Sequence, residues 1–150
     1  RREMLDQVGL LDERFFFSAE DVDIGWRAQL MGWKCVYSPQ AVVYHKLQAT
    51  GGGSIASYHN GRNFIFLIVK NYPWSLLRKN LGAVIGAQWN ISVEAVRAFR
   101  GKAARARLKG QLVGLLYIPL MLKSRWQIMS QRTVSDKELL LVLTPVDEVL

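Results

Sequence analysis

The stretch that decides the fold is Gly9-Leu-Leu-Asp12-Glu13-Arg14-Phe-Phe-Phe-Ser18-Ala-Glu20-Asp21-Val-Asp23-Ile-Gly-Trp26-Arg27. A glycine turn leads into three aromatic residues, and closely spaced carboxylates follow them. After these aromatic residues, Val22, Trp26 and Leu30 recur at the spacing of one helical face. The pattern predicts a helix that runs to Met31 and ends at Gly32, a residue type that is favoured just after a helix.

The acidic residues of this stretch fall at the start of the predicted helix. Backbone N–H groups and the helix dipole favour negative charge there, so Glu20 and Asp21 can stay ionised and accept a proton at neutral pH. A structural alternative exists, because Ser18 and Asp21 have nearly the spacing of a capping box. Asp23 is expected to pair with Arg27, four residues further along the helix.

Two short strand patterns follow the helix. They span Trp33–Ser38 and Ala41–Tyr44 and are separated by a turn at Pro39. Cys35 lies within the first pattern and is the single cysteine of the chain. We expect it to be a small buried core residue, because one thiol supports neither an intramolecular disulfide nor a zinc site. The glycines at 51–53 predict a flexible loop.

The later part of the chain reads as helical. One helix is expected from Tyr58 to just before Pro73. Further helices should follow, with breaks at Gly82, Gly101, Gly110 and Pro119. A last helix should begin after Ser135, with Glu138 as its capping-box partner.

The stretch 9–27, together with Gly32-Trp33-Lys34 and Ala41-Val-Val-Tyr44-His45, resembles the C-terminal part of the catalytic domain of family 2 glycosyltransferases, especially the rhamnosyltransferase-like members. The resemblance implies an α/β fold of the GT-A type with short strands over residues 1–72. A basic, mainly helical region over 73–150 would follow it. It also implies inverting transfer of a sugar from a nucleotide-sugar donor to an acceptor hydroxyl, in the assembly of cell-surface polysaccharide or glycolipid.

The resemblance assigns roles to individual residues. Ala19-Glu20-Asp21 matches the family motif whose aspartate is the general base, so Asp21 is the expected catalytic residue. Glu20, Gly9 and Phe17 are expected at the acceptor. His45 is the expected ligand of a divalent Mg²⁺ or Mn²⁺, whose main ligands should lie upstream of Arg1. Asp21-Val22-Asp23 is an alternative metal motif that ranks below the base assignment.

Arg62 is a candidate for binding the donor diphosphate. It lies near the glycine loop, and a guanidinium can engage two phosphate oxygens at once.

Positive charge is concentrated in the second half of the chain. Residues 1–75 hold 8 Lys and Arg against 7 Asp and Glu, whereas residues 76–150 hold 12 against 5. The apolar run Gln111–Leu122 is shorter than the about 20 residues of a transmembrane helix and contains Pro119. We therefore expect an amphipathic segment on an anionic membrane surface. The alternatives are a core helix with a solvated basic face, and nucleic-acid binding.

The sequence thus predicts the acceptor-side portion of a glycosyltransferase, inactive by itself. It would be cytoplasmic and peripheral on the inner face of the cell membrane. The expected partners are a nucleotide-sugar donor and a glycan or lipid-linked acceptor, without nucleic acid. The alternative function is a non-enzymatic basic helical module that binds a membrane surface or nucleic acid.

Overall fold

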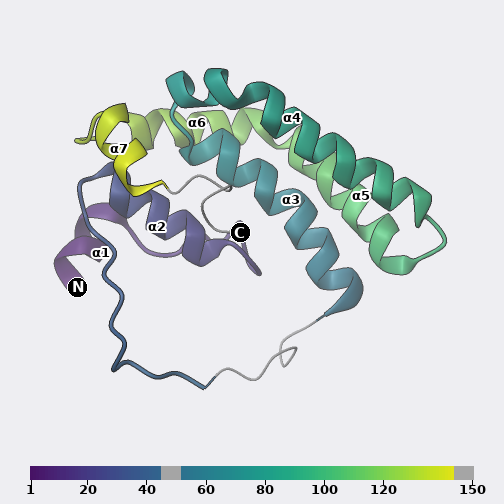
Figure 1. The fold of residues 1–150 in the computed structure, drawn as a ribbon, viewed down its shortest axis with the longest axis horizontal. Helices are drawn as coiled ribbons and strands as arrows, with labels where there is room; N and C mark the ends of the chain where they lie inside the picture. The colour runs from purple at the N-terminus through teal and green to yellow at the C-terminus, as the bar shows by residue number, and fades with distance from the viewer. Residues whose placement is uncertain (45–51, 144–150) are drawn as a thin grey trace.

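The computed structural model describes residues 1–44 and 52–143, and within them the regular structure is entirely helical (Figure 1). The helices are α1 (Arg2–Val8), α2 (Glu20–Leu30), α3 (Gly53–Asn71), α4 (Trp74–Arg97), α5 (Lys102–Leu116), α6 (Ile118–Ser130) and α7 (Asp136–Val142). Helices α3, α4 and α5 run side by side, and α1, α2 and α7 gather at the other end of the molecule (Figure 1).

Helix α3 is the centre of the packing, because it contacts α2, α5 and α6. Two buried clusters form around it. In one, Phe15 from the loop before α2 packs with Phe66 of α3 and Met121 of α6. In the other, α2, α4, α6 and α7 contribute Leu30, Leu76, Ile128 and Leu139. The aromatic loop at 15–17 is therefore fixed to the helical layer through one deeply buried ring.

Helices α3 and α5 approach each other through glycines. A Cβ on Gly61 would lie 2.5 Å from the carbonyl oxygen of Arg107, and a Cβ on Gly114 would lie 2.9 Å from Ile65 Cδ1. A Cβ on Gly110 would collide with the carbonyl oxygen of Tyr58. Because real Cβ atoms do not approach backbone atoms that closely, Gly61 and Gly110 need residues without a side chain, whereas at Gly114 the end of the Ile65 side chain would have to shift.

The expected α/β fold is wrong for the part of the chain that the structure describes. Residues 33–44 form an extended segment rather than strands, and Val36, Tyr37 and Val43 are each more than 80% exposed. A strand needs a neighbour to satisfy its backbone N–H and C=O groups, and none of the described residues pairs with this segment. Cys35 is correspondingly exposed rather than part of the core.

Several helix boundaries agree with the sequence and others do not. Helix α2 ends just before Gly32, which has φ of 84°. Gly101 separates α4 from α5, and Pro119 lies in the first turn of α6. Gly82 and Gly110, in contrast, lie inside uninterrupted helices. At Gly110 the close packing against α3 outweighs the roughly 1 kcal/mol helix cost of a glycine, whereas a Cβ at Gly82 would meet nothing within 4 Å.

The predicted caps had different outcomes. At α7, the capping box of Ser135 and Glu138 is confirmed. At α2, the alternative of a capping role for Ser18 is not found: Ala19 is the N-cap residue, and the Ser18 hydroxyl instead donates to Asn60 Oδ1 over 2.6 Å. None of the described helices combines the length and apolar character needed to cross a membrane.

Candidate functional site

The site begins with a buried group of charges beneath the Gly9–Asp12 turn. Asp23 of α2 is fully buried and accepts from Arg27 Nε at 2.9 Å and from Lys70 Nζ at 2.7 to 2.8 Å. Asn71 donates to the same carboxylate at 2.7 Å. The predicted pair of Asp23 and Arg27 is confirmed, although it is one part of a larger network.

The same cations hold the turn in place. Arg27 donates from Nη1 to the carbonyl oxygen of Val8 at 2.6 Å and from Nη2 to that of Leu10 at 2.7 Å. Lys70 Nζ also lies 2.6 Å from Asp12 Oδ2. Because Lys70 bridges two carboxylates, α3 is tied to both the turn and α2.

Asp12 is the second acid of this network. Burial by itself would raise the pKa of its carboxyl, but hydrogen bonds from Arg14 and Lys70 outweigh burial and hold the pKa well below its usual range. Arg14 donates to Asp12 Oδ1 over 2.7 Å and also reaches Ser124 Oγ on α6.

The loop between the turn and α2 has an unusual backbone. Phe16, Ser18 and Ala19 have φ of 55°, 68° and 69°, the left-handed region that non-glycine residues seldom adopt. Each such residue costs on the order of 1–2 kcal/mol, so surrounding contacts must impose the conformation.

Asn63 of α3 supplies the principal restraint. It is fully buried, and its Nδ2 donates to the carbonyl oxygens of Phe15, Phe17 and Ser18 at 2.7 to 2.9 Å. The neighbouring Arg62 donates from Nη2 to Arg14 O at 2.6 Å and to Phe15 O at 3.2 Å. Two consecutive residues of α3 thereby fix the strained loop that leads into Glu20 and Asp21.

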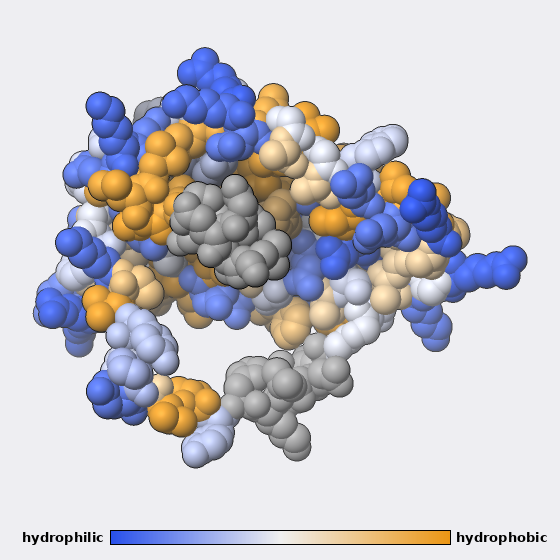
Figure 2. Space-filling view, viewed as in Figure 1, coloured by the Kyte–Doolittle hydropathy of each residue, from blue (hydrophilic) through white to orange (hydrophobic). Residues whose placement is uncertain are grey.

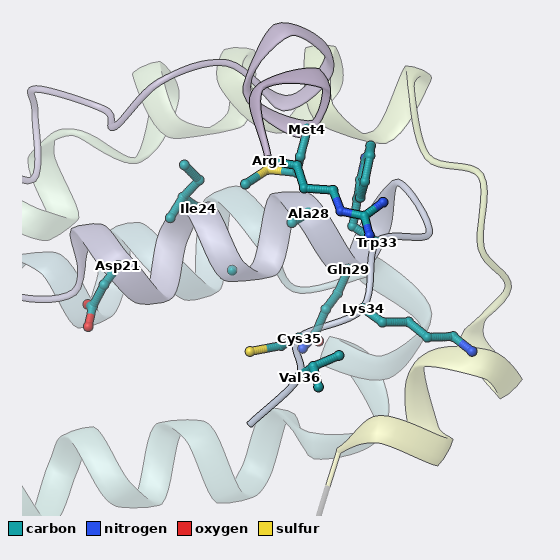
Figure 3. Close-up of a pocket in the computed structure, with 11 residues that line it drawn as sticks. Arg1, Met4, Asp21, Ile24, Ala28, Gln29, Trp33, Lys34, Cys35 and Val36 are labelled. Carbon is teal, nitrogen blue, oxygen red and sulfur yellow. The ribbon is translucent and has the colours of Figure 1, made fainter. Parts of the chain in front are cut away.

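Asp21 lies in the first turn of α2 and is exposed, as the sequence predicts for a helix start. Its Oδ1 accepts from the backbone N–H of Val22 at 2.8 Å. Asp21 lines one end of a pocket of about 560 Å³ whose other end is formed by Trp33 and Lys34 (Figure 3). The side chain of Asp21 is exposed at the edge of a cavity large enough for a small ligand, and Figure 3 shows its carboxylate pointing away from the other lining residues.

The other predicted acceptor residues lie on the same loop and turn. Glu20 begins α2, and its Oε2 is buried with no hydrogen-bond partner among the described residues. Gly9 follows α1 with φ of 85°. Phe17 is half-buried, with its ring centroid 6.0 Å from that of His59. The pKa of His59 is lowered, first by burial and then by the positive charge of Arg62.

The metal prediction depends on residues that the structure leaves out. His45 lies outside the described residues. Within 1–44 and 52–143, no three His, Cys, Asp or Glu side chains come together as a metal would require. Gly51 is also outside this part of the chain, whereas Gly52 and Gly53 form the start of α3.

Lys70 and Asn71 were given no individual role from sequence, although both contact Asp23. The signal that could indicate their role is the presence of polar residues inside an otherwise apolar helix. When such residues are buried, they need partners from another segment. The sequence does not show which segment supplies the partner, since Lys70 and Asn71 lie 47 and 48 residues beyond Asp23.

The chain is similar to part of a characterised enzyme. It is 41% identical over 78 residues to the N-acetylglucosaminyl-diphospho-decaprenol L-rhamnosyltransferases of two Mycobacterium tuberculosis strains, CDC 1551 / Oshkosh and ATCC 25618 / H37Rv. The alignment covers 49% of this chain and 25% of each relative, so the match is with a quarter of those enzymes. No family model and no solved structure matches the chain. The similarity supports a relationship with glycosyltransferases.

Proposed function

We propose that this chain is the acceptor-side portion of an inverting glycosyltransferase of family 2, and that Asp21 is its general base. The supporting observation is the exposed carboxylate of Asp21 beside a pocket, on a loop that buried contacts from α3 hold in a strained form. Strained backbone that is maintained by such contacts is typical of functional sites. The similarity to rhamnosyltransferases favours sugar transfer over other reactions at this site.

The proposed step is one proton transfer coupled to one displacement. Asp21 takes the proton of an acceptor hydroxyl while that oxygen bonds to the anomeric carbon of the donor. The bond from the anomeric carbon to the nucleotide diphosphate breaks on the opposite face, which inverts the configuration. Glu20, Gly9 and Phe17 would position the acceptor.

The substrates are proposed from the relatives and from the charge of the chain. The name of the relatives suggests a rhamnosyl donor and a sugar linked to a polyprenol diphosphate as acceptor. A lipid-linked acceptor agrees with our proposal that the basic helices bind the anionic inner face of the cell membrane. A divalent metal with His45 among its ligands is also part of the proposal, and it would stabilise the departing diphosphate. Arg62 as a diphosphate ligand would have to exchange its present contacts with the backbone.

The test is Asp21→Asn in the full-length protein, with sugar transfer and donor binding measured separately. Loss of the base should reduce turnover by about 10²–10⁴-fold and leave donor affinity unchanged. Asp6→Asn, at an exposed position of α1, is the matched control and should retain activity. Near-normal turnover of Asp21→Asn would refute the catalytic assignment.

A further inference from the structure

A row of apolar residues crosses the surface of α4 from its buried side to solvent. Leu77, Leu81, Ile85 and Trp89 recur every four residues, and their exposed fractions are 7%, 45%, 59% and 68%. Because four residues exceed one helical turn of 3.6 residues, this row turns gradually away from the packed side of α4, on which Ala95 near the end of the helix is again buried. Further along, large apolar side chains on the face toward α3 and α5 remain open to solvent, although their burial would be favourable.

A groove of about 390 Å³ lies beneath this face. Ile65, Ile68 and Val69 of α3 form part of its wall, together with Leu115 and Ile118. The polar lining residues are Gln88, Ser92 and Gln111, and they bond to one another: Ser92 Oγ lies 3.2 Å from Gln111 Oε1, and Gln111 Nε2 lies 3.0 Å from Gln88 Oε1. Gln88 Nε2 is buried without a hydrogen-bond partner among the described residues, but the rest of the wall is apolar or already hydrogen-bonded. Such a wall suits a hydrocarbon better than a peptide backbone, which would need hydrogen bonds along its length.

Gln88 lines both this groove and a second, more polar cavity. This second cavity has a volume of about 410 Å³ and is bordered by Ser18, Asn60, Asn63 and Arg107. Ala19 and Val22, which flank Glu20 and Asp21 in sequence, also line it. The structure records no hydrogen bond or ion pair for the Arg107 side chain among the described residues, so its guanidinium is available to an anion.

The surrounding helices favour an anionic ligand. Residues 74–130, which comprise α4, α5 and α6, contain ten Lys and Arg and one acid, Glu94. Figure 2 shows hydrophilic side chains projecting at the end where α4 and α5 meet, with hydrophobic residues on the neighbouring surface. A hydrocarbon chain with a phosphorylated head satisfies both parts of this surface.

We infer that the cavity pair binds an amphiphile, with a polyprenyl chain in the groove under α4 and a diphosphate at Arg107. The inference rests on the proposed function and specifies its acceptor site: the sugar carried by the diphosphate would extend from the Ser18 side of the polar cavity toward the Asp21 turn. Three other occupants are a second copy of the chain, a helix of another protein and the bilayer itself. The two neighbouring cavities favour the amphiphile, because it needs an apolar groove beside a cationic group such as Arg107.

The test is calorimetric titration of the full-length protein with farnesyl diphosphate, farnesol and inorganic diphosphate. Ile85→Glu places a carboxylate in the groove and should weaken farnesyl diphosphate binding at least about tenfold. Val96→Glu is the matched control, because Val96 is 60% exposed on the same helix and lines neither cavity. Circular dichroism and thermal unfolding should match for the two variants, since both original side chains are exposed.

The position of the diphosphate head is tested by comparing Arg107→Gln with Lys109→Gln. The second variant removes the same charge from an exposed position of α5. Arg107→Gln alone should weaken farnesyl diphosphate binding, and it should leave the weaker binding of farnesol unchanged. Equal losses of farnesyl diphosphate affinity in the two variants would contradict the placement of the diphosphate at Arg107. Long-range attraction by the positive charge of the helices would then explain the binding.

Three results would contradict the assignment of the groove as the site of the polyprenyl chain. They are equal binding by Ile85→Glu and Val96→Glu, self-association that only Ile85→Glu abolishes, and Ile85→Glu impairing binding to anionic vesicles but not to farnesyl diphosphate. These results are separate from failure of the proposed function, because the titration needs no sugar transfer. If Ile85→Glu binds farnesyl diphosphate normally while Asp21→Asn loses transfer, the groove is wrong and the catalytic proposal stands.

Discussion

Asn63 donates through one amide nitrogen to three backbone carbonyl oxygens, and this single side chain fixes the loop before α2. Its burial makes the arrangement costly to disturb, because carbonyl groups that lose their partner away from water retain their desolvation penalty. The contact joins residues about 45 positions apart. It is the residue-scale basis for the placement of Asp21.

Replacing Asn63 with Ala should therefore destabilise the protein. We expect the free energy of unfolding to fall by about 2–3 kcal/mol, since buried carbonyls lose their donor and a cavity remains. Asn90→Ala, at an exposed position inside α4, should change it by less than about 0.5 kcal/mol. Urea unfolding of both variants measures the difference, and similar small changes would show that the loop holds without Asn63.

The lowered pKa of the Asp12 carboxyl predicts how stability depends on pH. The folded-state pKa lies below that of the unfolded chain, about 3.9, so the stabilisation is complete above that value and is lost as the pH falls below it. The free energy of unfolding should decline between about pH 5 and pH 2. Asp12→Asn should flatten this decline, whereas the exposed Asp6→Asn should not. Parallel pH profiles for the two variants would contradict the prediction.

At the scale of elements, the contact between α3 and α5 depends on glycines that the sequence presents as helix breakers. Gly110→Ala should destabilise the protein by about 1–3 kcal/mol, because its Cβ would collide with the backbone of α3. Gly86→Ala is the matched change in α4, where a Cβ meets nothing within 4 Å, and it should stabilise by about 0.5–1 kcal/mol. Thermal unfolding should shift in opposite directions for the two variants.

The helices were largely predictable because their signals are local. The apolar spacing of α2, the glycine at its end and the capping box of α7 each lie within a few residues. The predicted strands were wrong because the alternation of apolar and polar residues at 33–44 does not by itself supply a neighbouring strand to pair with. The continuity of α4 and α5 through their glycines was also missed, since it depends on which helix lies opposite. Of the candidate site, the exposed acids were predictable, whereas Asn63 required knowledge of its partners.

At the scale of the whole molecule, α4, α5 and α6 combine net positive charge with exposed apolar residues such as Trp74, Leu116 and Trp126. Exposed apolar patches rimmed by charge mark interaction sites, and aromatic residues suit the boundary of a bilayer. This combination supports our proposal that the outer surface of these helices binds an anionic membrane.

Vesicle flotation should show binding to liposomes that contain phosphatidylglycerol, with recovery falling as salt rises from about 0.05 to 0.5 M. Trp126→Ser should reduce binding at every salt concentration, because it removes apolar contact rather than charge. Trp33→Ser, away from these helices, is the control. Equal recovery with neutral vesicles would contradict the electrostatic part of this prediction.

The dependence of the Asp21 loop on Asn63 has a consequence for biosynthesis. A nascent chain emerging from the ribosome has all the residues of the acidic segment well before α3 exists, yet the left-handed turn has no donor for its carbonyl oxygens until position 63 has been translated. The segment that would deprotonate a sugar thus acquires its shape only when the downstream scaffold arrives, which ties the maturation of the catalytic end to synthesis of the helices that follow it.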